Sequence, residues 1–490
     1  MSKSSFTRKE KTAAVFLLLA DVLIMLTVWL GQNYVQVDFD QLLFQVKTTS
    51  EGVHNGLLSS ALIQIGLFSL IMMLAEVLLY LQLTGRRHSS FIKKHILLFT
   101  VMVFSAALLI CGMQVHLFSF IKAESRESDF IQRQYVHPDS SILHFPAKKR
   151  NLIYIFLESM ESTFADPSAG DMITDCYIPE LAALADENLN FSHTEGLGGA
   201  LSYTGTTWTA AAMVAQTAGV PVKISLEADA YGAGDAFLPG VRSIGQILEE
   251  QGYSQVLLLG SNADFHGREM YFTEHGNYEI LDTDALKKAK RLPEDYEVWW
   301  GFEDEILFSY AREELTRLAE SETPFNFTML TADTHFPDGY PCRLCEDIYD
   351  FPYANVLACS SRQVADFIFW IQKQPFYENT TIIICGDHLT MDGGFMEDID
   401  PEYTRSIYNC IIHAAVEPIR QKARQFGTFD LFPTTLAALG VKIDGDRLAL
   451  GTNLFSDQAT LTEQFGYEFL AEELQQQSDF YDSELLLING

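Results

Sequence analysis

Basic residues are scarce in this chain of 490 residues, which has 33 lysines and arginines against 65 aspartates and glutamates. Ten of the basic and seven of the acidic residues precede residue 125, which leaves 23 basic and 58 acidic residues beyond it. A surface this acidic argues against nucleic acid as a partner and against peripheral adhesion to anionic lipid. Solubility alone is sufficient reason for the acidity.

Cysteine is sparse as well, with seven residues, and the sequence has no internal repeat and no low-complexity segment. Cys342 and Cys345 form a C-x-x-C pair, but no second ligand pair stands at the spacing that a zinc site needs. Cys385 and Cys410 lie in apolar runs, which is typical of buried thiols. In an oxidising compartment we expect a disulfide between Cys345 and Cys359.

Long apolar runs are abundant near the N-terminus, at residues 13–30, 57–83 and 96–121. Each run approaches or exceeds the ~20 residues that cross a bilayer as a helix. The first run is too long for a signal peptide and lacks a small-residue cleavage site, so we expect a retained anchor. Lysines and arginines gather before the first run and between the second and third, which predicts a cytoplasmic N-terminus. Three crossings then place everything after Lys122 outside the cytoplasm.

Two carboxylates, Asp21 and Glu76, lie well inside the first two expected spans. Carboxylates in lipid are costly and tend to face the interior of a helix bundle or a wet cavity. One interpretation is a polar contact for lipid or for a second span. The other, which we favour because hydrogen bonds between spans are common, is a protonated pair that holds the bundle together.

Residues 122–150 are polar and mixed and are expected to form a linker to an extracytoplasmic domain at 151–490. In that domain, short runs that are apolar on both faces, as buried parallel strands are, lie at 152–157, 255–260, 325–332, 381–386 and 408–414. Helical patterns stand between them, at 241–251, 302–319 and 361–372. This alternation predicts a doubly wound α/β fold with a mostly parallel sheet.

In such sheets, ligands bind beyond the carboxyl ends of the strands. Glu158 follows the first expected strand, His335 comes soon after the third, and Asp387 and His388 follow the fourth. Singly, each has a plain alternative as a helix cap or a surface residue. Together Glu158, Asp387 and His388 form a ligand set for a divalent cation such as Mn²⁺ or Mg²⁺.

A threonine-rich stretch, "SYTGTTWTAAAMVAQTAGVPV" at 202–222, leads into a small-residue helical pattern. Thr206 is placed at the start of that helix, where backbone N–H groups and the helix dipole favour a phosphate. A threonine hydroxyl there that also touches a metal could lose its proton and attack phosphorus. The alternative is an ordinary N-cap, worth about 1 kcal/mol.

Several segments in order from about residue 151 to 455 resemble the phosphoglycerol transferase and lipoteichoic acid synthase branch of the alkaline phosphatase superfamily. They are "NLIYIFLES" (Asn151–Ser159), "FSHT" (Phe191–Thr194), "AAMVAQTAGVPV" (Ala211–Val222), "WGFEDE" (Trp300–Glu305), "DTHFPDGY" (Asp333–Tyr340), "CGDHL" (Cys385–Leu389) and "FDLFPTTLAALG" (Phe429–Gly440). The third and fifth look closer to the transferases that act on osmoregulated periplasmic glucans. The resemblance implies a catalytic role for residues 151–490 and agrees with a multi-span anchor.

The resemblance also implies roles for single residues. Its metal site, one Mn²⁺-type cation, corresponds to Glu158, Thr206, Asp387 and His388, with Thr206 as nucleophile. Thr206 is preferred over its neighbours because it follows a glycine and lies thirteen residues before the next one, as in the family.

The headgroup contacts of the family correspond to His335 and to Arg268, which stands in "DFHGREMY". There the sequence departs from the family pattern, because His266 replaces a tryptophan, and His266 is included as a substrate contact. Arg268 as a plain surface residue stays an alternative.

The reaction that the resemblance implies moves glycerol phosphate from phosphatidylglycerol through a phospho-threonine to an envelope glycan or a glycerophosphate polymer, at a bacterial plasma membrane. A sulfatase would need an oxidisable Cys or Ser as nucleophile, and no cysteine lies between Cys176 and Cys342. A phosphoethanolamine transferase, a phosphodiesterase and a non-catalytic binding protein on the same fold remain as alternatives.

Overall fold

The computed structural model describes residues 6–35, 37–48, 59–84, 89–170, 173–224, 231, 236–296 and 298–487. The chain divides into two compact units. The first comprises Met1–Phe39 and Val53–Ile121, and the second comprises Asp40–Gly52 and Lys122–Gly490. The second unit therefore includes a short segment from between the first two expected spans.

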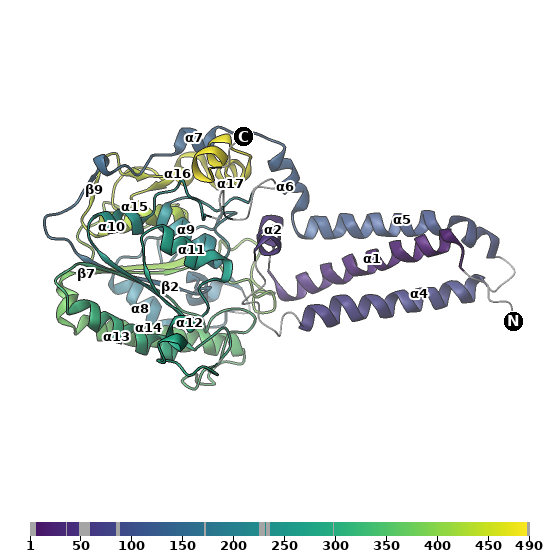
Figure 1. Cartoon of the computed structure of the whole chain (residues 1–490), viewed down its shortest axis with the longest axis horizontal. Helices are drawn as coiled ribbons and strands as arrows, with labels where there is room; N and C mark the ends of the chain where they lie inside the picture. Colours follow the sequence, from purple (N-terminus) through teal and green to yellow (C-terminus); the bar gives the residue numbers. More distant parts are fainter. Residues whose placement is uncertain are drawn as a thin grey trace. The chain divides into compact units, whose positions relative to one another are not determined.

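Three helices of the first unit are long and apolar enough to cross a membrane, and they lie where the three spans were predicted (Figure 1). They are α1 (Arg8–Asn33), the helix Ser59–Thr84 that contains α4 (Phe68–Thr84), and α5 (Ser89–Gln114). The third helix ends at Gln114, seven residues before the expected bound, because the backbone of His116 is left-handed (φ 51°). The chain then re-forms a helix as α6 (Leu117–Glu124).

The two intramembrane carboxylates differ from the hydrogen-bonded pair that we favoured. Asp21 is buried, and neither its Oδ2 nor Oε2 of Glu76 has a hydrogen-bond partner within the described part of the chain. Glu76 instead lines a cavity of about 130 Å³ among the helices of the first unit, with Glu10 and Tyr80. Most of the other residues that line this cavity are apolar, among them Phe6, Leu17 and Val77.

The second unit is built on a seven-stranded sheet with the order β3-β8-β7-β2-β6-β4-β5. Its strands are β2 (Asn151–Leu157), β3 (Gly199–Ala200), β4 (Ser254–Leu259), β5 (Glu279–Leu281), β6 (Phe325–Leu330), β7 (Thr380–Gly386) and β8 (Ile407–Ile412). The five strands from β7 to β5 are parallel, which confirms the predicted α/β class. The expectation that 408–414 is parallel was wrong, because β8 runs antiparallel to β7 and pairs with β3 at the edge.

Both faces of the sheet are covered, as the apolar strands predicted. Alternate residues of β2 enter two separate cores, with Leu152, Tyr154 and Phe156 in one and Ile153, Ile155 and Leu157 in the other. One core includes α9 (Thr209–Ala218), α10 (Ile244–Glu250), α11 (Arg268–Glu274), α15 (Leu431–Ala438) and α17 (Tyr467–Gln475). The other includes α8 (Pro179–Glu187), α13 (Asp304–Ala319) and α14 (Pro352–Gln372), and Figure 1 shows the two sets on opposite sides of the strands.

Residues 122–150, expected to form a linker, are instead folded into the second unit. Phe130 and Ile131 of α7 (Phe130–Gln134) are buried, and β1 (Leu143–His144) pairs with β9 (Lys442–Ile443). The remaining α-helices and strands of the described residues are α2 (Phe39–Lys47), α12 (Thr283–Lys288), α16 (Leu461–Phe465) and the hairpin of β10 (Arg447–Leu448) with β11 (Gly451–Thr452). The apolar residues of this segment are scattered among polar ones without a helical or strand period, so the sequence does not indicate this packing.

Candidate metal and transfer site

The central strands bring three of the expected ligands together. Strands β2 and β7 are parallel neighbours whose last residues, Leu157 and Gly386, pair in register. The next residues along each strand, Glu158 and Asp387, therefore meet at one edge of the sheet. The ladder continues one step further, because the backbone N–H of Asp387 donates to the carbonyl of Leu157 (3.0 Å).

Glu158, Asp387 and His388 form a compact buried cluster. Nε2 of His388 lies 3.5 Å from Oε1 of Glu158 and 3.5 Å from Oδ2 of Asp387, and one ligand atom from each residue lies within 4.8 Å of the others. Oδ2 of Asp387 is buried without a hydrogen-bond partner in the described residues, which is costly for a carboxylate oxygen. The site therefore offers one imidazole and two carboxylates, one of which has an oxygen without a hydrogen-bond partner among the described residues. This donor set fits a divalent cation.

Hydrogen bonds around the cluster orient the three side chains. Oδ1 of Asp387 accepts the backbone N–H groups of Ser159 and His388, both at 2.7 Å, and the Ser159 hydroxyl donates to Oε1 of Glu158 (2.7 Å). Nδ1 of His388 lies 2.8 Å from the carbonyl of Leu389, to which it donates. That bond leaves Nε2, the atom that faces the carboxylates, as the unprotonated ligand nitrogen.

The electrostatics of the cluster are those of a buried, charge-rich site. Burial, followed by the Glu158 carboxylate, raises the pKa of Asp387 to about 7. Burial lowers the pKa of His388, but the carboxylates of Asp387 and Glu158 outweigh it, so the net shift is upward. For Glu158, burial raises the pKa, but the charges of His335, His388 and Arg268 reverse this and hold it below the usual value. A bound cation would offset the negative charge that the protein buries here.

A threonine other than the expected Thr206 stands at this cluster. Thr209 is the first residue of α9, after the N-cap Trp208, and its side chain is partly exposed. Its hydroxyl donates to Oε2 of Glu158 (3.3 Å) and lies 3.4 Å from Nε2 of His388. Thr209 therefore has the contact with the candidate metal ligands, the partial solvent access and the helix N-terminus that were expected of Thr206.

Thr206 itself points elsewhere, so the structure differs from that expectation. Its side chain is fully buried, and its hydroxyl donates to the carbonyl of Tyr203 (2.8 Å) and accepts the N–H of the same residue (3.2 Å). The cause is the tight turn at Gly205 (φ 78°), where an added Cβ would lie 2.5 Å from the carbonyl oxygen of Val222. Thr206 thus closes the turn that precedes α9.

Two of the three expected headgroup residues, His335 and Arg268, lie near Glu158, and His266 lies near these two. The charges of His335 and Arg268 both act on Glu158, and those of Arg268 and His335 act on His266. Arg268 is 5% exposed at the start of α11, so it is not the plain surface residue of the alternative interpretation. The ring of His335 lies 4.4 Å from that of Trp300, a residue that the "WGFEDE" motif contained but that was given no role.

Two guanidinium nitrogens of Arg268 are held by the loop that follows β4. Nε donates to the carbonyl of Phe265 (3.1 Å), and Nη2 donates to the hydroxyl of Ser261 (3.1 Å) and to the carbonyl of Asn262 (2.6 Å). Burial lowers the pKa of Arg268 to about 10, so the guanidinium still carries its charge at neutral pH. A fixed and charged arginine suits contact with phosphoryl oxygens.

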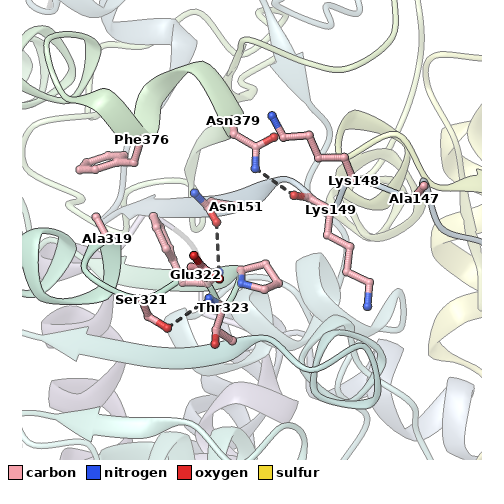
Figure 2. Close-up of a pocket in the computed structure, with 12 residues that line it drawn as sticks. Ala147, Lys148, Lys149, Asn151, Ala319, Ser321, Glu322, Thr323, Phe376 and Asn379 are labelled. Carbon is pink, nitrogen blue, oxygen red and sulfur yellow. Dashed lines mark hydrogen bonds between the residues drawn. The ribbon is translucent and has the colours of Figure 1, made fainter.

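A separate pocket of about 520 Å³ lies at the opposite end of the sheet (Figure 2). Asn151 and Phe325, which begin β2 and β6, line it together with Lys148, Lys149 and Asn379. It contains none of the cluster residues. Since ligands of such sheets bind at the carboxyl ends of the strands, we assign the chemistry to the cluster rather than to this pocket.

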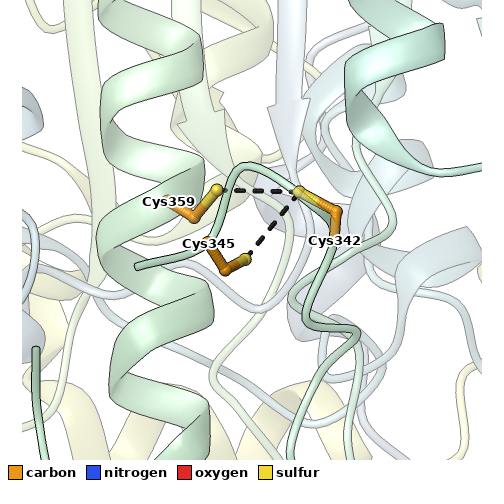
Figure 3. A group of neighbouring side chains, drawn as sticks. All are labelled: Cys342, Cys345 and Cys359. Atoms are coloured by element: carbon orange, nitrogen blue, oxygen red, sulfur yellow. Dashed lines mark hydrogen bonds between the residues drawn. The ribbon is translucent and has the colours of Figure 1, made fainter. Parts of the chain in front are cut away.

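The cysteines show a further difference from expectation. No disulfide is formed among the seven cysteines, so the Cys345–Cys359 bond is absent. Instead Sγ of Cys342 lies 3.7 Å from that of Cys359 and 3.8 Å from that of Cys345 (Figure 3). The C-x-x-C loop folds against α14, and this places Cys342 beside both Cys345 and Cys359, which were expected to bond to each other.

Comparison with known proteins adds to this geometry. The family model described as Sulfatase matches residues 150–441. Phosphoglycerol transferase I of Shigella flexneri is 31% identical over 347 residues, which cover 69% of this chain and 43% of that protein. The chain thus spans less than half the length of the curated relatives it matches.

Two solved structures share the fold, each with a TM-score of 0.51. The lipoteichoic acid synthase LtaP of Listeria monocytogenes is 18% identical, and the match covers 67% of this chain and 80% of that one. The integral membrane lipooligosaccharide phosphoethanolamine transferase A of Neisseria meningitidis is 15% identical, and the match covers 90% of this chain and 87% of that one. At 90% of this chain, the second match includes part of the first unit.

Proposed function

The chain belongs to the sulfatase family, and on that premise we propose that it is a membrane-anchored phosphoglycerol transferase. Its donor is phosphatidylglycerol, and its acceptor is a hydroxyl of an envelope glycan or of a glycerophosphate polymer. The contact of the Thr209 hydroxyl with Glu158 and His388 carries the proposal. The likeness to phosphoglycerol transferase I supports the choice of the transferred group.

The proposed nucleophile is Thr209 in place of Thr206. A nucleophilic hydroxyl has to face both the cation and the substrate, and among the two only the Thr209 hydroxyl faces the cluster from a partly exposed position. The oxygen sits at the N-terminus of α9, a helix of ten residues, whose dipole favours the developing negative charge. An enzyme that hydrolyses sulfate esters, as the sulfatases within this family do, would need an oxidisable cysteine or serine in place of this threonine.

The transfer has two displacement steps. In the first, Oγ1 of Thr209 bonds to phosphorus, the bond from phosphorus to the diacylglycerol oxygen breaks, and diacylglycerol leaves with a proton. In the second, the acceptor hydroxyl bonds to phosphorus and the bond to Thr209 breaks, which restores its hydroxyl. Arg268 binds the phosphoryl oxygens, and His335 and His266 contact the glycerol.

Glu158, Asp387 and His388 would hold one divalent cation, for which Mn²⁺ is our first choice and Mg²⁺ the second. When bound, the cation lowers the pKa of the Thr209 hydroxyl and offsets charge on the phosphoryl oxygens. Both carboxylates are oriented before any cation arrives, through the hydrogen bonds that Ser159 gives to them.

We further propose a bacterial plasma membrane location, a cytoplasmic N-terminus and an extracytoplasmic catalytic unit. Asp40–Gly52 follows the first span, and Lys122–Gly490 follows the third, and the two fold as one unit. Segments that fold together lie on one side of the membrane. With three crossings, the segment after the first span and the segment after the third do lie on the same side. The positive charge before the first span favours the cytoplasm for the N-terminus.

Diacylglycerol release tests the proposal. The full chain, purified in detergent and supplied with Mn²⁺, is added to vesicles of phosphatidylglycerol or of phosphatidylethanolamine, alongside Thr209→Ala and Thr206→Ala. We expect release from phosphatidylglycerol by the unmodified chain and by Thr206→Ala, and none by Thr209→Ala. Release from phosphatidylethanolamine alone would favour a phosphoethanolamine transferase. Release from neither lipid would favour a binding protein on this fold.

A further inference from the structure

Helix α2 stands in the chain between the first two spans, yet its residues from Asp40 onward belong to the second unit. Its side chains are unequally exposed, because Val46 is 83% exposed and Phe44 only 1%. Phe44 belongs to the same buried apolar core as Trp208. One face of α2 is therefore interior surface of the second unit.

The buried face of α2 touches residues next to the transfer site. The ring of Phe44 lies 5.2 Å from that of Trp208, 5.2 Å from that of His266 and 5.7 Å from that of Tyr231. Trp208 immediately precedes Thr209, and His266 lies two residues before Arg268. The buried ring of Phe44 thus packs against Trp208, which precedes the proposed nucleophile, and against His266, which lies near Arg268.

A polar contact accompanies the aromatic ones. Nε2 of His266 lies 2.7 Å from Oε1 of Gln45 and donates to it. Burial, followed by the charges of Arg268 and His335, lowers the pKa of His266 to about 3, so the ring is neutral and has one N–H. Because Gln45 takes that hydrogen at Nε2, Nδ1 is left as an acceptor, and the tautomer of His266 is fixed.

A third contact reaches the loop that follows β7. The Gln41 side-chain amide donates to Sδ of Met391 (3.3 Å), which lies three residues after His388. Helix α2 therefore contacts the segments after β4 and β7 and the segment that begins α9, each of which carries a residue of the site.

We propose that α2 is a positioning element of the transfer site, in which Phe44 and Gln45 hold Trp208 and His266 and thereby place the nucleophile and the headgroup contacts. This inference rests on the proposed transfer function. It means that the catalytic unit is incomplete without the loop between the first two spans. Positioning of this kind matters because a shift of about 1 Å at a reacting group can cost roughly 10²-fold in rate.

The test uses the full chain in detergent with Mn²⁺ and vesicles that contain phosphatidylglycerol, and measures diacylglycerol release against lipid concentration. Phe44→Ala is expected to lower kcat/KM by roughly 10²-fold. Gln45→Leu is expected to raise KM with little change in kcat, and Gln45→Glu, which keeps an acceptor for His266, to restore KM. Val46→Ala, on the exposed face of the same helix, is the matched control and should behave as the unmodified chain.

Two further readouts separate positioning from folding. Binding of Mn²⁺ alone should be unchanged in Gln45→Leu, because Glu158, Asp387 and His388 are untouched. Amide hydrogen exchange of peptides that contain Trp208 or His266 should rise in Phe44→Ala and not in Val46→Ala. Should Phe44→Ala fail to fold, Gln45→Leu decides. If the unmodified chain releases diacylglycerol and both Phe44→Ala and Gln45→Leu do so with the same kinetics, the inference about α2 is wrong and the proposed function stands. If the unmodified chain releases no diacylglycerol, the proposed function is wrong and the inference falls with it.

Discussion

Removal of the cation should lower the free energy of unfolding of the second unit, and the size of this effect should depend on Asp387. Oδ2 of Asp387 is buried and unpartnered, so the folded protein gains when a cation binds there. At a Mn²⁺ concentration one hundred times the Kd, linkage gives about 2.7 kcal/mol, because the unfolded chain has no such site. For a chain of this size that free energy raises Tm by about 3 °C.

Asp387→Asn keeps the volume of the side chain and the Oδ1 acceptor for Ser159 but removes the charge. If the Kd rises a hundredfold, the same Mn²⁺ concentration contributes only about 0.4 kcal/mol, and Tm should hardly move. The assay is differential scanning calorimetry of the full chain with Mn²⁺ and with chelator. The control is Glu314→Gln, a buried carboxylate of α13 that pairs with Arg291 and Arg317. An equal Mn²⁺ shift in Asp387→Asn and the unmodified chain would refute the assignment of the cation to this cluster.

Three other predictions follow from single contacts. Thr206→Ala removes the hydrogen bond to Tyr203 and should lower the free energy of unfolding by about 1 kcal/mol, measured by urea titration, and unchanged stability would contradict the assigned role. Burial raises the pKa of Asp333 to about 10 and that of Asp304 to about 7, so the folded state binds more protons than the unfolded state above pH 4. Stability should therefore fall as pH rises from 5 to 9, and Asp333→Asn should flatten this dependence in thermal unfolding at several pH values. The thiols of Cys342, Cys345 and Cys359 lie close together. In an oxidising buffer we expect one disulfide among these three cysteines and one free thiol, measured by thiol titration. Three titratable thiols would contradict this prediction.

The cation ligands could be predicted because they depend on a local rule. Glu158 and Asp387 each stand directly after an apolar strand, and parallel neighbours bring such residues together at the carboxyl edge. The five main strands were recognisable from their apolar runs for the same reason. The direction of β8 was not, since an antiparallel strand that is buried on both faces has the same composition as a parallel one.

The nucleophile could not be chosen from composition. Thr206 and Thr209 are three residues apart, and which hydroxyl faces the cluster depends on the left-handed turn at Gly205, which rotates the chain before α9 begins. One signal was available, because Thr209 opens the small-residue helical pattern while Thr206 precedes it. The contact of Phe44 with Trp208 joins residues 164 positions apart, and no local pattern indicates a packing of that range.

Mass spectrometry of the intact modification tests the central claim most directly. The purified full chain is incubated with phosphatidylglycerol and Mn²⁺ without an acceptor, quenched in acid and digested, and fragmentation locates any glycerophosphate within the peptide that contains both threonines. The account predicts the adduct on Thr209 and its loss in Thr209→Ala but not in Thr206→Ala. An adduct on Thr206, or one that persists in Thr209→Ala, would contradict it.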